Sequence, residues 1–182
     1  FHFRQGQAAR EVDCAGALHY LREGSGSQDF VWLHFNLAHA GCERWMRANL
    51  ALPDDFYASL HEGSRSTHVE QVDTSLLAVV NDVVFDFTMV SSDISTLWLC
   101  AQQRVLISAR LQPLHSVDKL RHSVKQGESF CSPLELLIHL FRDQAEVLTQ
   151  IVRKTNQGVD RIEDQLLSQR VGSNRAELGS MR

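Results

Sequence analysis

Hydrophobic positions in the last third of the chain recur at alternating steps of four and three residues. Only Thr155 interrupts the series with a polar side chain, and its apolar members are Phe141, Ala145, Leu148, Val152, Val159, Ile162 and Leu166. Such a heptad pattern is typical of a helix that packs along partner helices. It predicts one uninterrupted helix from Ser132 to about Arg170, with another helix starting near Asn174.

The start of this helix is marked by a capping box, Ser132-Pro133-Leu134-Glu135. We expect the Ser132 hydroxyl to accept from the Glu135 amide, and the Glu135 carboxylate to accept from the Ser132 amide. Pro133 suits the first helical position, where no amide is needed. Roughly forty helical residues extend about 60 Å. We therefore predict a stalk, residues 132–182, that projects from a globular domain of residues 1–131.

Residues 1–131 are predicted to form two strands, two short helices, a run of strands and a further helix. The run from Phe30 to Leu37 is apolar on both alternating faces, which predicts a buried strand covered by helices on each side. Helices are expected over 41–52, 56–61 and 114–125, the last ending at Gly127. Strands are expected over 14–21, 67–72, 75–80, 83–89, 96–101 and 105–109, with 1–10 as a loose arm or an edge strand.

Short turns between these strands set the sheet type. Asn81 and Asp82 tolerate left-handed geometry and predict a tight hairpin turn, and residues 102–104 predict a second hairpin. The predicted fold is therefore α/β (α+β): an α/β/α sandwich with a mixed, largely antiparallel sheet, followed by a long C-terminal stalk helix.

Composition narrows the function classes. The chain has 182 residues, a formal net charge of −4 and scattered basic residues, which argues against a nucleic-acid surface. No apolar run approaches the eighteen or so residues that cross a bilayer. The four cysteines show no C-x-x-C pairing, so we expect reduced thiols rather than disulfides.

Nine histidines raise the question of a metal site. His115, Asp118 and His122 are the best-spaced set, because steps of three and four place them on one helix face, as zinc ligands on a helix require. The alternative is an ordinary solvated helix face. Weaker sets are His61 with His68 and Glu70, and His34 with His39. On its buried strand, His34 is expected to be a hydrogen-bonded core histidine.

Enzymatic chemistry finds no recognisable motif. The sequence lacks G-x-S-x-G, a Gly-rich phosphate loop and a cysteine with a base at a known family spacing. The carboxylates Glu163 and Asp164 fit a solvated helix face. A metal-dependent hydrolase using His115 and His122 is the remaining enzymatic hypothesis, and we expect that the protein is not an enzyme.

The order of several short motifs suggests a family. These are Val31-Trp32-Leu33-His34, Glu70-Gln71-Val72-Asp73-Thr74-Ser75-Leu76-Leu77, Ser132-Pro133-Leu134-Glu135-Leu136-Leu137, Asp160-Arg161-Ile162-Glu163-Asp164-Gln165-Leu166-Leu167 and the tail Leu178-Gly179-Ser180-Met181-Arg182. With them the chain resembles the cytoplasmic domain of the CorA-like divalent-cation transporters, most closely the bacterial zinc-transport branch called ZntB.

This resemblance implies a function. Family members are inner-membrane homopentamers whose N-terminal domains form a cytosolic funnel, and whose stalk helices lead to two C-terminal spans with a Gly-Met-Asn motif. The motif and spans are absent here, so the chain would be the funnel domain of such a protein. Expected partners are copies of itself, divalent cations and the membrane through the missing spans, with zinc as the transported or regulatory ion and no required cofactor. The rival hypothesis is a soluble signalling or scaffold protein that binds a partner through its long helix.

Overall fold

The computed structural model describes residues 1–23, 28–62, 67–84 and 94–180, with side chains up to residue 167. The elements in chain order are β1 (His2–Phe3), α1 (Cys14–Glu23), β2 (Phe30–Asn36), α2 (Cys42–Asn49), α3 (Asp54–His61), β3 (His68–Val72), β4 (Ser75–Val83), β5 (Ile94–Ala101), β6 (Val105–Arg110), α4 (His115–Lys125) and α5 (Pro133–Ser180). They form two units, residues 1–144 and residues 145–182.

A six-stranded sheet lies at the centre of residues 1–144, in the order β1-β2-β6-β5-β4-β3. The pair β2 and β6 is parallel, and the other neighbouring pairs are antiparallel. The mixed, largely antiparallel sheet that we predicted is therefore confirmed. Residues 1–10 supply the edge strand β1, one of the two alternatives expected for them.

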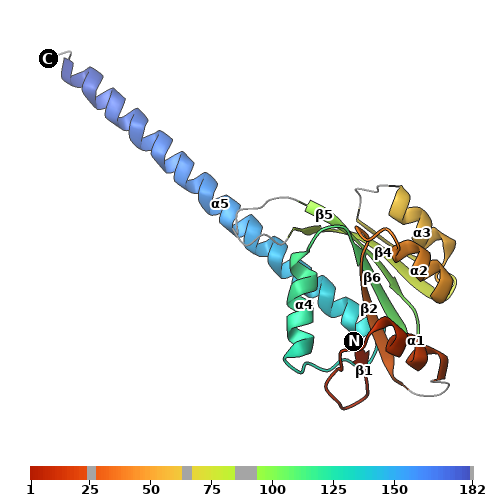
Figure 1. Ribbon diagram of the computed structural model, residues 1–182. Coiled ribbons are helices and arrows are strands. Elements are labelled where there is room, and N and C mark those ends of the chain that lie inside the picture. Colours follow the sequence, from red (N-terminus) through yellow and green to blue (C-terminus); the bar gives the residue numbers. More distant parts are fainter. Residues whose placement is uncertain (24–27, 63–66, 85–93, 181–182) are drawn as a thin grey trace. The chain divides into compact units, whose positions relative to one another are not determined.

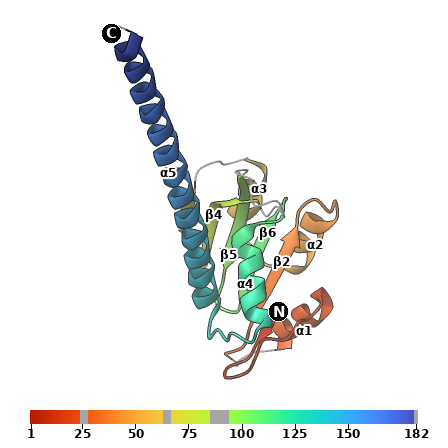
Figure 2. The ribbon, with the colours of Figure 1, turned by 90° about the vertical axis from the view of Figure 1, so that its left-hand side faces the viewer.

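Helices cover both faces of the sheet, as Figure 1 and Figure 2 show. One face packs against α4 and residues 133–144 of α5 in a buried cluster that includes Trp32, Leu99, Leu120 and Leu137. The other packs against α1, α2 and α3 in a cluster that includes Leu33, Met46, Phe56 and Ile107. Because successive side chains of a strand point to opposite faces, β2 supplies both clusters.

Residues 14–21, expected to be a strand, form helix α1 instead. The Asp13 carboxylate accepts a hydrogen bond of 2.8 Å from the Gly16 amide, which satisfies a donor at the start of the helix. Ala17 is fully buried, and Tyr20 and Leu21 pack against the same cluster. These residues have helical spacing, so an N-cap and a short apolar face were the overlooked signal.

The hairpin turn predicted at Asn81 and Asp82 is also wrong, because both residues lie inside β4. They pair with Thr96 and Ser95 of β5. The turn before β4 falls at Asp73, which has a φ of 51°. Of the strand predicted over 83–89, residue 83 ends β4, residue 84 forms an isolated bridge with Leu114, and 85–89 lie outside the described residues.

Asp82 is buried because its carboxylate accepts hydrogen bonds from two elements. One carboxylate oxygen accepts from the Val83 amide, and the other accepts from the amide and hydroxyl of Ser116 in the first turn of α4. A carboxylate at a helix N-terminus satisfies free amides and complements the helix dipole. The strand residue Asp82 therefore caps α4 in place of its N-cap residue Leu114, which has no side-chain cap bond.

Helix α5 begins at the predicted capping box, with one change. Ser132 Oγ accepts from the Glu135 amide at 3.1 Å, as expected. The Glu135 carboxylate accepts instead from the Cys131 amide at 2.6 Å, one residue before the predicted donor. The helix then continues through Gly172 and Ser173 to Ser180, so the helix expected to start near Asn174 belongs to α5. The predicted division at residues 131 and 132 stays a prediction.

Candidate functional site

The predicted zinc ligands lie on α4, whose buried side includes Val117 and Leu120. Asp118 faces Arg121, with 3.7 Å between its carboxylate oxygen and the guanidinium nitrogen, and the exposed His122 lies 3.5 Å from the Gln126 amide nitrogen. Within the described part of the chain, no three His, Cys, Asp or Glu side chains are grouped so that they could hold a metal ion. The site at His115, Asp118 and His122 therefore stays a prediction.

The structure brings the set of His61, His68 and Glu70 together only in part, because His68 lies near Glu70 whereas His61 has another partner. His61 of α3 lies 3.1 Å from the Glu43 carboxylate of α2, where Arg47 also binds. His68 is 3.9 Å from Glu70. These exposed contacts join neighbouring helices or residues of one strand, and each is worth little free energy because water screens it.

His34 is the hydrogen-bonded core histidine that we predicted. Arg110 donates from Nε to His34 Nε2 at 2.9 Å, so this nitrogen is the acceptor and Nδ1 carries the hydrogen. Nδ1 then donates to Ser108 Oγ at 2.8 Å, which also accepts from Trp32 Nε1 at 2.8 Å. Burial, with the nearby Arg110 guanidinium, lowers the pKa of His34 from 6.5 to about 3. The imidazole is therefore neutral at physiological pH, and it joins the parallel strands β2 and β6.

An ion pair between a buried carboxylate and an exposed ammonium joins α4 to α5. The Lys119 ammonium lies 2.7 Å from Asp143 Oδ1, and Asp143 is 4% exposed. His139 lies between Asp143 Oδ2, at 3.5 Å, and Glu128 of the preceding loop, at 3.4 Å. This network was not predicted from the sequence, although Asp143 follows Leu136 and Leu140 at the spacing of a buried helix face. A carboxylate at such a position signals a paired buried charge.

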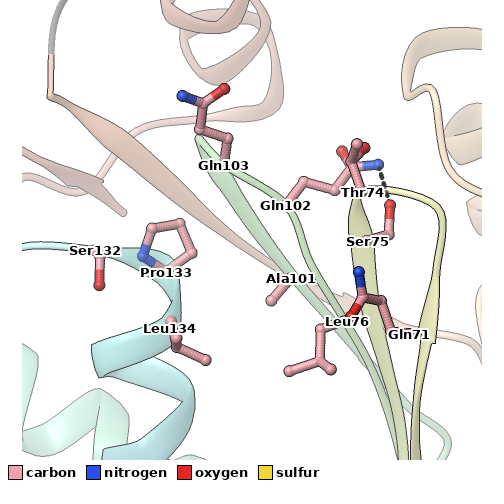
Figure 3. A pocket seen from close by; sticks show the side chains of 10 residues that line it. All are labelled: Gln71, Thr74, Ser75, Leu76, Ala101, Gln102, Gln103, Ser132, Pro133 and Leu134. Atoms are coloured by element: carbon pink, nitrogen blue, oxygen red, sulfur yellow. Dashed lines mark hydrogen bonds between the residues drawn. The ribbon is translucent and has the colours of Figure 1, made fainter.

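A groove opens where two strand turns meet the first turn of α5 (Figure 3). Its volume is about 470 Å³, and none of its ten lining residues is charged. Leu76, Ala101 and Leu134 supply apolar surface, and Gln71, Thr74 and Gln103 supply amides and a hydroxyl. Gln102 is held by hydrogen bonds from its amide nitrogen to Ala51 O at 2.9 Å and Ser75 Oγ at 3.0 Å. The groove can thus accept an uncharged group with both polar and apolar parts.

The unit of residues 145–182 exposes the heptad positions as an apolar stripe. The exposed members are Leu148, Val152, Val159, Ile162 and Leu166, between 42% and 58% exposed. A helix whose apolar stripe is exposed is marginal by itself in water, because helical stability in proteins comes mostly from packing an apolar face. We call these five residues the α5 stripe. In chemical terms it is a surface for another helix.

Within the described residues, no helix combines the length and apolar character that crossing a membrane requires. The polar groups above join neighbouring elements, and two of the surfaces that the described residues leave open are the groove and the α5 stripe. Neither has the paired acid, base or nucleophile that a catalytic centre needs.

Comparison with known proteins adds a family and a fold. A family model described as CorA-like Mg²⁺ transporter protein matches residues 27–182. Among curated proteins, none matches the chain.

Several solved structures share the fold. The full-length CmaX protein matches with a TM-score of 0.67 and 21% identity, over 74% of this chain and 42% of that one. The ZntB cytoplasmic domain from Vibrio parahaemolyticus RIMD 2210633 matches with 0.57 and 16%, over 68% and 52%. The soluble domain of CorA from Methanocaldococcus jannaschii matches with 0.58 and 14%, over 80% and 58%. The chain thus spans about half the length of these proteins, and the predicted fold class is confirmed.

Proposed function

Because the chain belongs to the CorA-like Mg²⁺ transporter family, we propose that it is the cytoplasmic domain of an inner-membrane divalent-cation transporter whose membrane spans follow Arg182. Two structural relatives, a ZntB cytoplasmic domain and a CorA soluble domain, support this role. Transport needs an ion path and a conformational change rather than bond chemistry, so no catalytic residue is part of the proposal.

The observation that carries this proposal is the α5 stripe. Five exposed apolar side chains at heptad spacing suit a helix that lies beside other helices. In the proposed transporter, copies of the chain form a homopentameric funnel in which their α5 helices pack together as stalks. Joining to the membrane spans would raise the effective concentration of the helices, because the spans would hold the copies side by side.

Zinc is the ion that we propose for this chain. The support is the similarity to a ZntB domain, together with the helical spacing of His115, Asp118 and His122, which the single chain does not group into a complete metal site. Imidazole and carboxylate ligands suit Zn²⁺, whereas Mg²⁺ prefers oxygen ligands and bound water. A cation at these residues that favours one packing of the copies would shift the assembly between two arrangements.

Metal titration tests the ion assignment. Isothermal calorimetry of the chain with Zn²⁺ and with Mg²⁺ should show Zn²⁺ binding that the double variant His115→Gln, His122→Gln weakens at least about tenfold. The matched control is His19→Gln, His61→Gln, which changes exposed histidines elsewhere. Equal Zn²⁺ binding by all three proteins, or binding of Mg²⁺ alone, would contradict the zinc assignment while leaving the transporter proposal in place.

The alternative function is a soluble signalling or scaffold protein that uses the same stripe to bind a partner's helix. The complete gene discriminates between the two. A product that fractionates with the membrane and carries two apolar spans with Gly-Met-Asn supports the transporter, and a soluble product without such spans supports the alternative.

A further inference from the structure

The outer edge of β3 and the adjoining groove lie next to each other in the unit of residues 1–144. β3 ends the strand order, and of the described strands only β4 pairs with it. An edge strand presents a row of backbone N–H and C=O groups that can accept a further strand. Gln71 belongs both to this edge strand and to the lining of the groove.

The register of the hairpin shows which residues face outward. Val72 pairs with Ser75 across the turn, and residues along an antiparallel strand alternate between bonding to the partner and facing away from it. Because a two-residue turn is closed by a hydrogen-bonded pair, we infer that Val72 and Glu70 bond to β4, which leaves the amides and carbonyls of Val69 and Gln71 at the outer edge. This alternation supplies donors and acceptors at the spacing of an added strand.

The side chains of the same two residues lie on the groove face. Val69 is opposite Ala78 and Gln71 is opposite Leu76, and opposed residues share a face of the sheet. Ala78 belongs to the cluster under α4 and α5, and Leu76 packs against that cluster. Val69 and Leu134 are each 51% exposed, so apolar surface is open beside the outward backbone groups.

The groove itself selects against charge. Its lining residues are neutral, and Gln102 is already fixed by its bonds to Ala51 and Ser75 (Figure 3). A charged group placed there would lose hydration without gaining an opposite charge. A peptide amide, or a small apolar side chain, would find Gln71, Thr74, Gln103 and the apolar floor of Leu76 and Leu134.

We propose that the outer edge of β3 and this groove form a binding site for an extended, uncharged peptide segment of another protein. The segment adds to the sheet beside Val69 and Gln71, so backbone hydrogen bonds supply affinity, and an alternate side chain enters the groove and supplies selectivity. The inference goes beyond transport, because it gives the domain a surface for a separate polypeptide and does not depend on any membrane span.

Nuclear magnetic resonance of the ¹⁵N-labelled chain tests this site. The probe is acetyl-Thr-Val-Gln-Leu-Thr-amide at about 1 mM, a concentration suited to weak strand addition. We expect its addition to shift the amide signals of Val69 and Gln71 and to slow their hydrogen exchange at least about tenfold. Two control peptides have the same side chains but carry methyl groups on alternate backbone nitrogens. Each blocks hydrogen bonding along one edge of the peptide. The version that blocks the edge facing β3 should have no effect.

Protein variants distinguish strand addition from non-specific binding of the peptide. Gln71→Pro removes an outward amide without removing a bond to β4, and should abolish the response. Leu134→Glu places a charge at the groove and should weaken binding at least about fivefold, whereas Leu111→Glu, at a similarly exposed position elsewhere, should not.

Three results would overturn the proposal. One is the absence of shifts at Val69 and Gln71 with the unmodified peptide. Another is an equal response to both methylated probes. The third is protection of the same amides without peptide in a concentration-dependent dimer, which would make a second copy the occupant. Should Gln71→Pro fail to fold, the methylated probes and Leu134→Glu still decide the question.

Discussion

Residues 133–144 and residues 145–167 belong to one helix but differ in what they bury. In the first stretch Leu136, Leu137 and Leu140 are at most 1% exposed, and even the carboxylate of Asp143 is buried and paired. In the second, apolar side chains at heptad spacing are about half exposed. The same helical pattern therefore serves a hydrophobic core in one stretch and an open surface in the other. Burial, rather than periodicity, separates a structural role from a role in association.

The largest difference in stability between the two stretches should appear when one leucine in each is replaced by alanine. We expect Leu137→Ala to lower the free energy of unfolding by about 2–5 kcal/mol, because it leaves a cavity in a packed core. Leu166→Ala should change it by less than about 0.5 kcal/mol in the dilute chain. Urea unfolding followed by circular dichroism measures both, and equal losses would remove the distinction between the stretches.

We expect the free energy of unfolding of residues 1–144 to fall in acid, because this unit contains His34. Its pKa is lowered from 6.5 to about 3 in the folded chain, so between these values the unfolded chain binds one more proton. Stability from this group is therefore fully present above about pH 6.5 and falls as the pH drops toward 3. Between pH 7 and pH 4 the loss should be about 2–3 kcal/mol.

Urea unfolding over this pH range checks that prediction with two variants. His34→Gln should flatten the dependence on pH, even though it lowers stability at pH 7. His39→Gln, at an exposed histidine, should keep the wild-type slope. An unchanged slope in His34→Gln would mean that another group carries the acid sensitivity.

A smaller effect is expected from the ion pair between α4 and α5. Lys119→Met leaves the buried Asp143 carboxylate without its nearest cation, and should cost about 1–3 kcal/mol because Lys119 itself is partly exposed. Lys154→Met, in the exposed stretch, should cost almost nothing. Thermal unfolding of the two variants side by side makes the comparison, and equal melting temperatures would argue that the pair is energetically unimportant.

The smallest effect should be at the start of α5. Ser132→Ala removes the acceptor of the Glu135 amide and should cost about 1 kcal/mol. Thr149→Ala removes a hydroxyl that bonds back to Ala145 within the helix, and should be neutral. A difference below experimental error in chemical unfolding would show that the Glu135 carboxylate alone maintains this helix end.

Local signals in the sequence predicted much of this molecule. The run from Phe30 to Leu37, apolar on both alternating faces, predicted the buried strand that ends at Asn36. Ser132 with Pro133 predicted the start of α5 to the residue. One error arose where a residue serves a distant element, and another where the local pattern was short. Asp82 could be read as a turn former because nothing near it in the sequence shows that it caps α4. Helix α1 is short, so its N-cap Asp13 and few apolar positions competed with an equally plausible strand pattern.

The candidate sites likewise differ in whether their residues are close together or far apart in the sequence. His34 could be assigned to the core because its strand is apolar on both faces, whereas its partners Ser108 and Arg110 are more than seventy residues away. The groove was unpredictable for that reason, since it combines Gln71 of β3, Gln102 of the turn after β5 and Leu134 of α5. The α5 stripe was visible in the sequence, and the structure adds that it is exposed in the single chain.

The molar mass of the chain in solution, measured by sedimentation at rising concentration, tests most directly whether the α5 stripe is an association surface. We predict concentration-dependent assembly that is lost in the variant Val152→Gln, Val159→Gln, Ile162→Gln, with the unfolding midpoint of residues 1–144 unchanged. A monomer at every accessible concentration, or an assembly that the three substitutions leave intact, would contradict the account.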